Sequence, residues 1–163
     1  MRDSLRLLLF AFSLSVLLAC DGEVLYKEQT SLPSKGWDYD HPIRFTYTVD
    51  DTAQVLNMVL DVHHVKDYRW QNLYVKLFTS FPGGRRDTQL LSLELADRKG
   101  HWLGKSKLKS SNIITPILLQ ESFKFQIPGT YTLDIQQDMR VNPVKGIRKL
   151  ELRLEKVHIT ERK

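Results

Sequence analysis

The chain has 163 residues, of which 42% are hydrophobic, 26% charged and 10% aromatic, and its formal net charge is +5. These values are typical of one ordinary globular domain and exclude a disordered tail, a coiled coil, a collagen-like rod and a multi-span membrane protein. The single Cys excludes a disulfide framework and an all-Cys zinc site.

Residues 1–19 have the layout of a lipoprotein signal peptide. A short basic region precedes an apolar run over residues 7–18, which is shorter than the ~20 residues that a bilayer-spanning helix needs. The run ends in a lipobox-like word, Leu17-Leu18-Ala19-Cys20. Cys20 is therefore the expected lipidation site, and its acyl chains would hold the mature protein on a membrane. The alternative is a plain secreted protein with a free thiol.

Residues 20–42 are predicted to form a lipidated tether. They contain turn-forming Gly and Pro residues and show no sustained hydrophobic period. Trp37 and Tyr39 are placed to fasten the end of the tether to the domain that follows. The mild positive charge of the exported chain gives no nucleic-acid footprint, so no nucleic-acid partner is expected.

From residue 43 onward, apolar and polar residues alternate with period two over short runs. This pattern is typical of half-buried β-strands. The expected strands cover residues 43–49, 56–62, 70–78, 91–95, 123–127, 131–135 and 150–154. We therefore predict that residues 43–163 form an all-β domain, an antiparallel β-sandwich of about seven or more strands.

Three stretches depart from this simple pattern. The run 70–78 is apolar on both faces, so its strand is expected to be central and covered on both sides. Residues 97–122 lack clear alternation and are expected to form a long loop. Residues 148–157 contain good helix formers, but their leucines stand two apart and would spread around a helix, which favours a strand.

The sequence offers no constellation of catalytic or metal-binding residues. Asp61 and His63 would share one face of a strand while His64 points the other way, and two ligands do not make a zinc site, so surface or edge histidines are expected. Glu94 and Asp97 could pair as carboxylates, but nothing sets their separation. We expect no cofactor, no metal, no catalytic residue and no small-molecule substrate.

Two groups of residues suggest binding instead. Trp37, Tyr68, Trp70 and Trp102 could line a flat sugar-binding surface, which would make the protein a lipid-anchored carbohydrate-binding module. The basic run at Lys105, Lys107 and Lys109 is interpreted as a solvated loop, with contact to anionic lipid headgroups as the alternative.

Several words of the chain resemble the gliding-motility lipoprotein family GldH of the Bacteroidetes, from the lipobox to about Glu155. No single word is specific, but their order and spacing together are. The matching words are Gly36-Trp37, Asp67-Tyr68, Asn72-Leu73-Tyr74, Phe81-Pro82-Gly83, Asp87-Thr88, Leu95-Ala96-Asp97, Gly100, Trp102-Leu103-Gly104, Pro128-Gly129-Thr130-Tyr131, Gln137, Met139-Arg140 and Gly146-Ile147.

The resemblance implies a non-enzymatic, lipid-anchored protein of the cell membrane or outer envelope. It further implies association with the gliding-motility and type IX secretion machinery, with other envelope proteins as partners. The leaflet stays open at this point. The word around Trp102 combines a carboxylate, two glycines and a large apolar side chain in a polar stretch, which is typical of a docking loop. The expected interaction residues are Asp97, Gly100, Trp102, Leu103, Gly104, Gln137, Met139 and Arg140.

Overall fold

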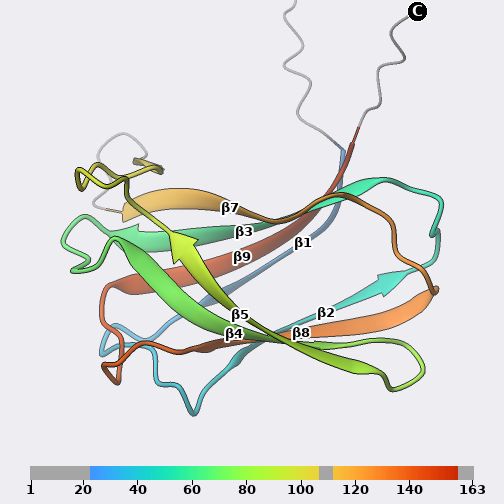
Figure 1. Cartoon of the computed structure of the whole chain (residues 1–163), viewed down its shortest axis with the longest axis horizontal. Coiled ribbons are helices and arrows are strands. Elements are labelled where there is room, and N and C mark those ends of the chain that lie inside the picture. The colour runs from blue at the N-terminus through green and yellow to red at the C-terminus, as the bar shows by residue number, and fades with distance from the viewer. Residues whose placement is uncertain (1–22, 107–111, 158–163) are drawn as a thin grey trace, which may run out of the picture.

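The computed structural model describes residues 23–106 and 112–157, and it is built entirely from strands and their connections (Figure 1). The strands are β1 (Val24–Ser31), β2 (Ile43–Val49), β3 (Leu56–Val65), β4 (Asn72–Ser80), β5 (Arg86–Glu94), β6 (Lys105–Ser106), β7 (Asn112–Phe123), β8 (Gly129–Gln137) and β9 (Ile147–Lys156). Within these described ranges, no helix of a length and apolarity sufficient to cross a membrane occurs.

The strands form two antiparallel sheets that pack face to face. One sheet has five strands in the order β1-β9-β3-β7-β6, and the other has four in the order β2-β8-β4-β5. The all-β sandwich predicted from the alternating pattern is confirmed. The strand predicted over 43–49 coincides with β2, and the stretch 148–157 falls largely in strand β9 rather than in a helix.

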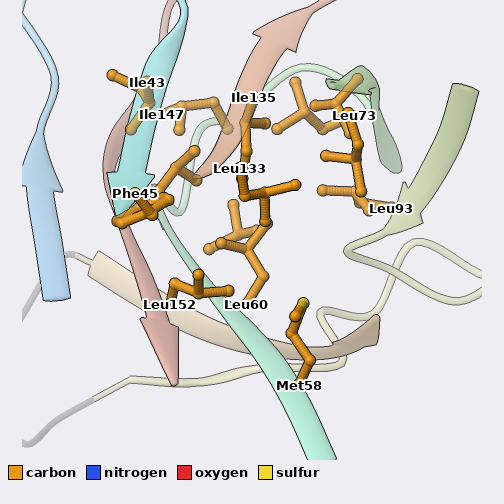
Figure 2. Close-up of a cluster of buried hydrophobic side chains, with 14 of the residues drawn as sticks. Ile43, Phe45, Met58, Leu60, Leu73, Leu93, Leu133, Ile135, Ile147 and Leu152 are labelled. Carbon is orange, nitrogen blue, oxygen red and sulfur yellow. The ribbon is translucent and has the colours of Figure 1, made fainter. Parts of the chain in front are cut away.

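The core lies between the inner faces of the two sheets. Phe45 of β2, Leu60 of β3 and Leu152 of β9 are each fully buried, and Figure 2 shows them turned toward a common interior together with Leu133 of β8. Every second residue of β2 is buried and the residues between are exposed. Burying these apolar side chains is the main force that holds the two sheets together.

The segment expected to be a tether contributes a strand to the sandwich. Residues 24–31 form β1, which pairs with β9 from Val24, opposite Glu155, to Ser31, opposite Lys149. β1 is an edge strand with mostly exposed side chains, so it shows no alternation in the sequence. Its conformation comes from the hydrogen bonds that β9 offers, which sequence periodicity does not report.

The prediction of a long loop over residues 97–122 is also wrong for the second half of this stretch. Residues 112–123 form β7, which pairs with β3 along its length. Pro116 interrupts the apolar pattern, and it is tolerated because β6 pairs with Ile113 and Ile114, and in the part of the chain that the structure describes the rest of that edge of β7 has no strand partner. The strand expected over 123–127 is not formed, since residues 124–128 connect β7 to β8.

Strand β4 is central, as predicted, because it lies between β5 and β8. However, it is covered on one side only. Leu73 and Val75 point into the core, whereas Tyr74 on the other face is 44% exposed. Trp70 precedes the strand instead of belonging to it.

The strand directions define two ends of the sandwich. The connections β1–β2, β3–β4, β5–β6–β7 and β8–β9 meet at one end, which we call the distal end, and β1 begins and β9 finishes at the opposite end (Figure 1). With a rise of about 3.3 Å per residue, the length of β1 separates the two ends by roughly 25 Å. The distal end is therefore remote from the start of the described chain.

Candidate functional site

Most of the words that carry the family resemblance meet at the distal end. Gly36-Trp37 lies in the β1–β2 connection, Asp67-Tyr68 in the β3–β4 connection, and the stretch from Leu95 to Gly104 between β5 and β6. Gln137 ends β8, and Gly146-Ile147 opens β9. Residues distant in the sequence thus share one end of the molecule. Leu17, Leu18, Ala19 and Cys20 lie outside the described residues.

Asp97 holds the turn that leads into the Trp102 segment. Its Oδ1 accepts hydrogen bonds from the backbone N–H groups of Lys99 and His101, each at 2.8 Å, and its Oδ2 contacts Nδ1 of His101 at 3.1 Å. These contacts, the backbone N–H of His101 first, hold the pKa of Asp97 below its ordinary value. Gly100 takes a φ of 84°, which favours glycine at this turn. Asp97 and Gly100 therefore shape the loop.

Trp102 packs back onto the sandwich. Its backbone bridges to Ala96, its side chain is half-buried, and its ring centroid lies 4.5 Å from that of His64. Gly104 passes so close to β7 that an added Cβ would lie 2.7 Å from the carbonyl carbon of Ile114. Leu103, between them, is 56% exposed. This segment, residues 95–106, is called the arm below, and it is fastened to the sheet on both sides of Leu103.

His64 is a core residue, contrary to the surface or edge position expected from the sequence. It is fully buried, Nδ1 lies 3.0 Å from the carbonyl oxygen of Val65, and Nε2 lies 3.2 Å from Oγ1 of Thr115. Since a carbonyl only accepts, Nδ1 carries the proton and Nε2 accepts from the Thr115 hydroxyl. Burial lowers the pKa of His64 from its ordinary value, so the ring is neutral.

A chain of aromatic rings runs from the arm across the distal end. From Trp102 and His64 it continues to Tyr68, 5.8 Å away between ring centroids, and then to Trp70 at 5.4 Å. The hydroxyl of the buried Tyr68 donates to the carbonyl oxygen of Asn72. Ring pairs at these separations pack favourably, so the arm and the β3–β4 connection form one rigid unit.

Gln137 organises the connection between β8 and β9. Its side chain is 1% exposed; Nε2 donates to Oδ1 of Asn142 at 3.0 Å, and Oε1 accepts from the backbone N–H of Met139 at 2.9 Å. The sulfur of Met139 lies 3.3 Å from the backbone N of Tyr74. Gln137 and Met139 thus hold the segment against β4, while Arg140 is exposed at its tip.

The residues predicted to form a docking surface therefore divide into two kinds. Asp97, Trp102 and Gln137 shape and fasten the segments in which they lie. Leu103 and Arg140 direct their side chains to solvent. The interaction itself stays a prediction, and these two exposed side chains are its most direct candidates.

A cleft of about 460 Å³ opens at the distal end between the β3–β4 and β8–β9 connections. Trp70, Val141 and Pro143 supply apolar walls, and Arg69, Lys145 and Arg148 supply positive charge. Asp67 is the one carboxylate in the lining. Sequence reasoning missed these cations because Arg69 lies in the β3–β4 connection, far along the chain from Lys145 in the β8–β9 connection and Arg148 at the start of β9, and no periodicity or motif connects these segments.

The other binding patterns considered from the sequence look different in the fold. Trp37 is 1% exposed and Tyr68 is buried, so with Trp70 and Trp102 they do not make one exposed sugar-binding surface. Lys105 lies in β6 at the distal end, remote from the start of β1, whereas Lys107 and Lys109 lie outside the described residues. Among residues 23–106 and 112–157, no three His, Cys, Asp or Glu side chains are grouped to hold a metal ion.

A family model and two related proteins indicate the same family. The family model described as GldH lipoprotein matches residues 24–154. A gliding motility lipoprotein GldH homolog of Christiangramia forsetii is 29% identical over 93% of this chain and 91% of its own length. The gliding motility lipoprotein GldH of Flavobacterium johnsoniae is 25% identical over 83% of each chain.

Among solved structures, a family GH115 4-O-methyl-alpha-glucuronidase with specificity for decorated arabinogalactans matches 85% of this chain at 11% identity and a TM-score of 0.40. The matched region is 18% of that enzyme, so the chain spans less than a fifth of its length.

Proposed function

Because the chain belongs to the GldH lipoprotein family, we propose that it is a lipid-anchored, non-enzymatic protein of the bacterial cell envelope that works with the gliding-motility and type IX secretion machinery. The observation that carries this proposal is the family match over residues 24–154, which includes β1 to β8 and most of β9. The relatives in C. forsetii and F. johnsoniae are both described as gliding motility lipoproteins.

The expected anchor at Cys20 lies very close to the sandwich in the sequence. β1 begins at Val24, so Asp21, Gly22 and Glu23 are the residues between them. Fully extended, this link spans about 10 to 14 Å. A lipid on Cys20 would therefore hold the end of the sandwich where β1 begins near the membrane and leave the distal end facing away from it.

We place the contact with other envelope proteins at the distal end. It presents Leu103 on the fastened arm and Arg140 on the segment that Gln137 holds. An exposed apolar side chain on a rigid support suits a protein interface, since little conformational freedom is lost on binding. Trp102 supports this surface from beneath through its packing on His64.

The experiment is a clean deletion of the gene in its own host, complemented with the wild-type gene or with Cys20→Ala. Labelling with a radioactive fatty acid tests the anchor, and spreading together with the release of type IX cargo tests the function. We expect the wild type to be labelled and to restore both activities, and Cys20→Ala to lose the label and to stay uncleaved or soluble.

Three results would count against the proposal. Labelling of the Cys20→Ala protein at the wild-type level would show that the lipid is not attached to Cys20. A deletion strain that spreads and secretes as well as its parent would contradict the proposed role in motility and secretion. A Leu103→Ala and Arg140→Ala double variant that is labelled and folded but recovers its envelope partners as well as wild type would move the docking surface elsewhere.

A further inference from the structure

We propose that the cleft between the β3–β4 and β8–β9 connections binds an acidic, extended segment of a partner protein. The inference rests on the proposed function, because that function supplies a protein partner, and it adds the chemistry of the contact. It is carried by three cationic side chains that line one cavity and have no ionic partner within residues 23–106 and 112–157.

The cations of the cleft differ from the paired cations Arg44 and Arg153 on the two sheets. Arg44 pairs with Asp134 at 2.6 Å, and Arg153 pairs with Asp61 at 2.8 Å, so each of these two cations is neutralised by a neighbour. In contrast, Arg69, Lys145 and Arg148 take part in no ion pair among the described residues. Three cations against Asp67 leave the lining with a net positive charge.

The polar groups of this cleft are mainly hydrogen-bond donors. A guanidinium and an ammonium group donate and never accept, whereas sugar hydroxyls need acceptors as well as donors. A ligand with carboxylates needs donors only, and the planar guanidinium groups of Arg69 and Arg148 suit two-pronged contacts to carboxylates. The lining therefore favours an anion over a neutral sugar.

The apolar walls favour a peptide as the source of that anion. Trp70, Val141 and Pro143 lie in the same cavity as the cations, so the site offers apolar contacts beside positive charge. A segment in which carboxylate and apolar side chains alternate would place both kinds of group along one extended strand. The distal position keeps the cleft away from lipid phosphates when Cys20 holds the opposite end near the membrane.

The test uses the full chain in detergent and a synthetic peptide of alternating Glu and Val residues, with fluorescence anisotropy as the measurement. Arg69→Gln with Lys145→Gln removes two exposed cations of the cleft. Arg98→Gln with Lys99→Gln is the matched control, because it removes one Arg and one Lys that are exposed on the neighbouring arm. We expect the first pair of substitutions to raise the Kd for the peptide on the order of tenfold. The control pair should leave the Kd within about twofold of the wild-type value.

Four further measurements decide the chemistry of the ligand. A peptide with Gln in place of Glu should bind at least about tenfold more weakly than the Glu peptide. Added salt should weaken the binding of the Glu peptide, because it screens the attraction between the charges. Equal binding of both peptides, or an equal loss in the control pair, would overturn the proposal. An oligosaccharide of uronic acids, or vesicles of anionic lipid, that bind more tightly than the peptide and depend on Arg69 and Lys145 would assign the cleft to that ligand instead.

The deletion strain separates this inference from the proposed function. If the cleft variant restores spreading and secretion fully and still binds the peptide, the inference fails while the proposed function stands. If the deletion itself has no phenotype, the proposed function fails, and the peptide measurement with the purified protein still decides the charge preference of the cleft.

Discussion

The ring of Trp102 lies 4.5 Å from the ring of His64 between centroids, tilted by 57°. One residue comes from a loop and the other from the core face of β3, so this contact fastens the arm to the interior of the sandwich. The next residue, Leu103, is left exposed as a result. Loss of this contact should therefore be visible in stability, while loss of Leu103 should not.

Replacing Trp102 with Ala removes this contact and opens a cavity beside His64. We expect the free energy of unfolding to fall by about 2 to 3 kcal/mol, below the value for a fully buried Trp because this side chain is half-buried. Urea denaturation of the full chain measures it. Leu103→Ala is the control and should change stability by at most about 0.5 kcal/mol. Equal effects of the two variants would contradict the packing described for the arm.

Gly104→Ala tests the close approach of the arm to β7. The added Cβ would overlap the carbonyl group of Ile114 and Oγ1 of Thr115, so strand or arm must shift. We expect a loss of about 2 to 3 kcal/mol. Gly100→Ala is the comparison, since it meets open space and carries only the strain of a positive φ, about 1 kcal/mol. A smaller effect at Gly104 than at Gly100 would contradict the predicted overlap.

Because His64 is buried and neutral in the folded protein, we expect the protein to lose stability in mild acid. Its pKa is lowered in the folded protein, so above its ordinary value of 6.5 the ring is neutral in both states and has no effect on the balance. Below that pH the unfolded chain takes up the proton first, and stability falls by up to about 1.4 kcal/mol per pH unit until the folded pKa is reached.

Denaturation between pH 7.5 and pH 5 measures this slope. His64→Gln removes the titrating group and should flatten it. The lowered pKa values of Asp97 and Glu151 act in a more acidic range, because their ordinary values are 3.8 and 4.5. A slope between pH 7.5 and pH 5 that is unchanged in His64→Gln would assign the acid sensitivity to other groups.

Gln137→Leu tests the support beneath Arg140. The substitution leaves the backbone N–H of Met139 without its acceptor and Asn142 without one donor. We expect a loss of about 1 to 3 kcal/mol and faster proteolysis within residues 138–143. Arg140→Gln, at an exposed position, should change neither quantity measurably. Unchanged proteolysis in Gln137→Leu would mean that the segment is held by other contacts.

Alternation was enough to predict the strands whose inner faces build the core. In β2, β8 and β9, apolar residues stand two apart because their side chains face the core, and the stretches 43–49, 131–135 and 150–154 carried that pattern openly. The edge strand β1 shows no such pattern. Most of its side chains are exposed, so no face of this strand has to be apolar. β7 was hidden in the same way by Pro116 and by its exposed positions.

His64 shows what a residue's neighbours add. The sequence assigned it correctly to the face opposite His63, but an alternating pattern does not report that Thr115, Tyr68 and Trp102 enclose that face. The same holds for Gln137, whose burial and hydrogen bonds depend on Asn142 and on the path of the β8–β9 connection.

Sequence patterns were enough to predict the all-β class, most of the core strands and a lipid anchor at Cys20, and they carried the resemblance to a family. Each of these predictions rests on residues close together in the sequence: a period of two, an apolar run that ends at a Cys, or a series of short motifs. The folded chain was needed to see that Trp102 packs inward while Leu103 points out, and that Arg69, Lys145 and Arg148 share one cleft. Those relationships depend on which loops the strand order brings to the same end, and long-range strand pairing sets that order.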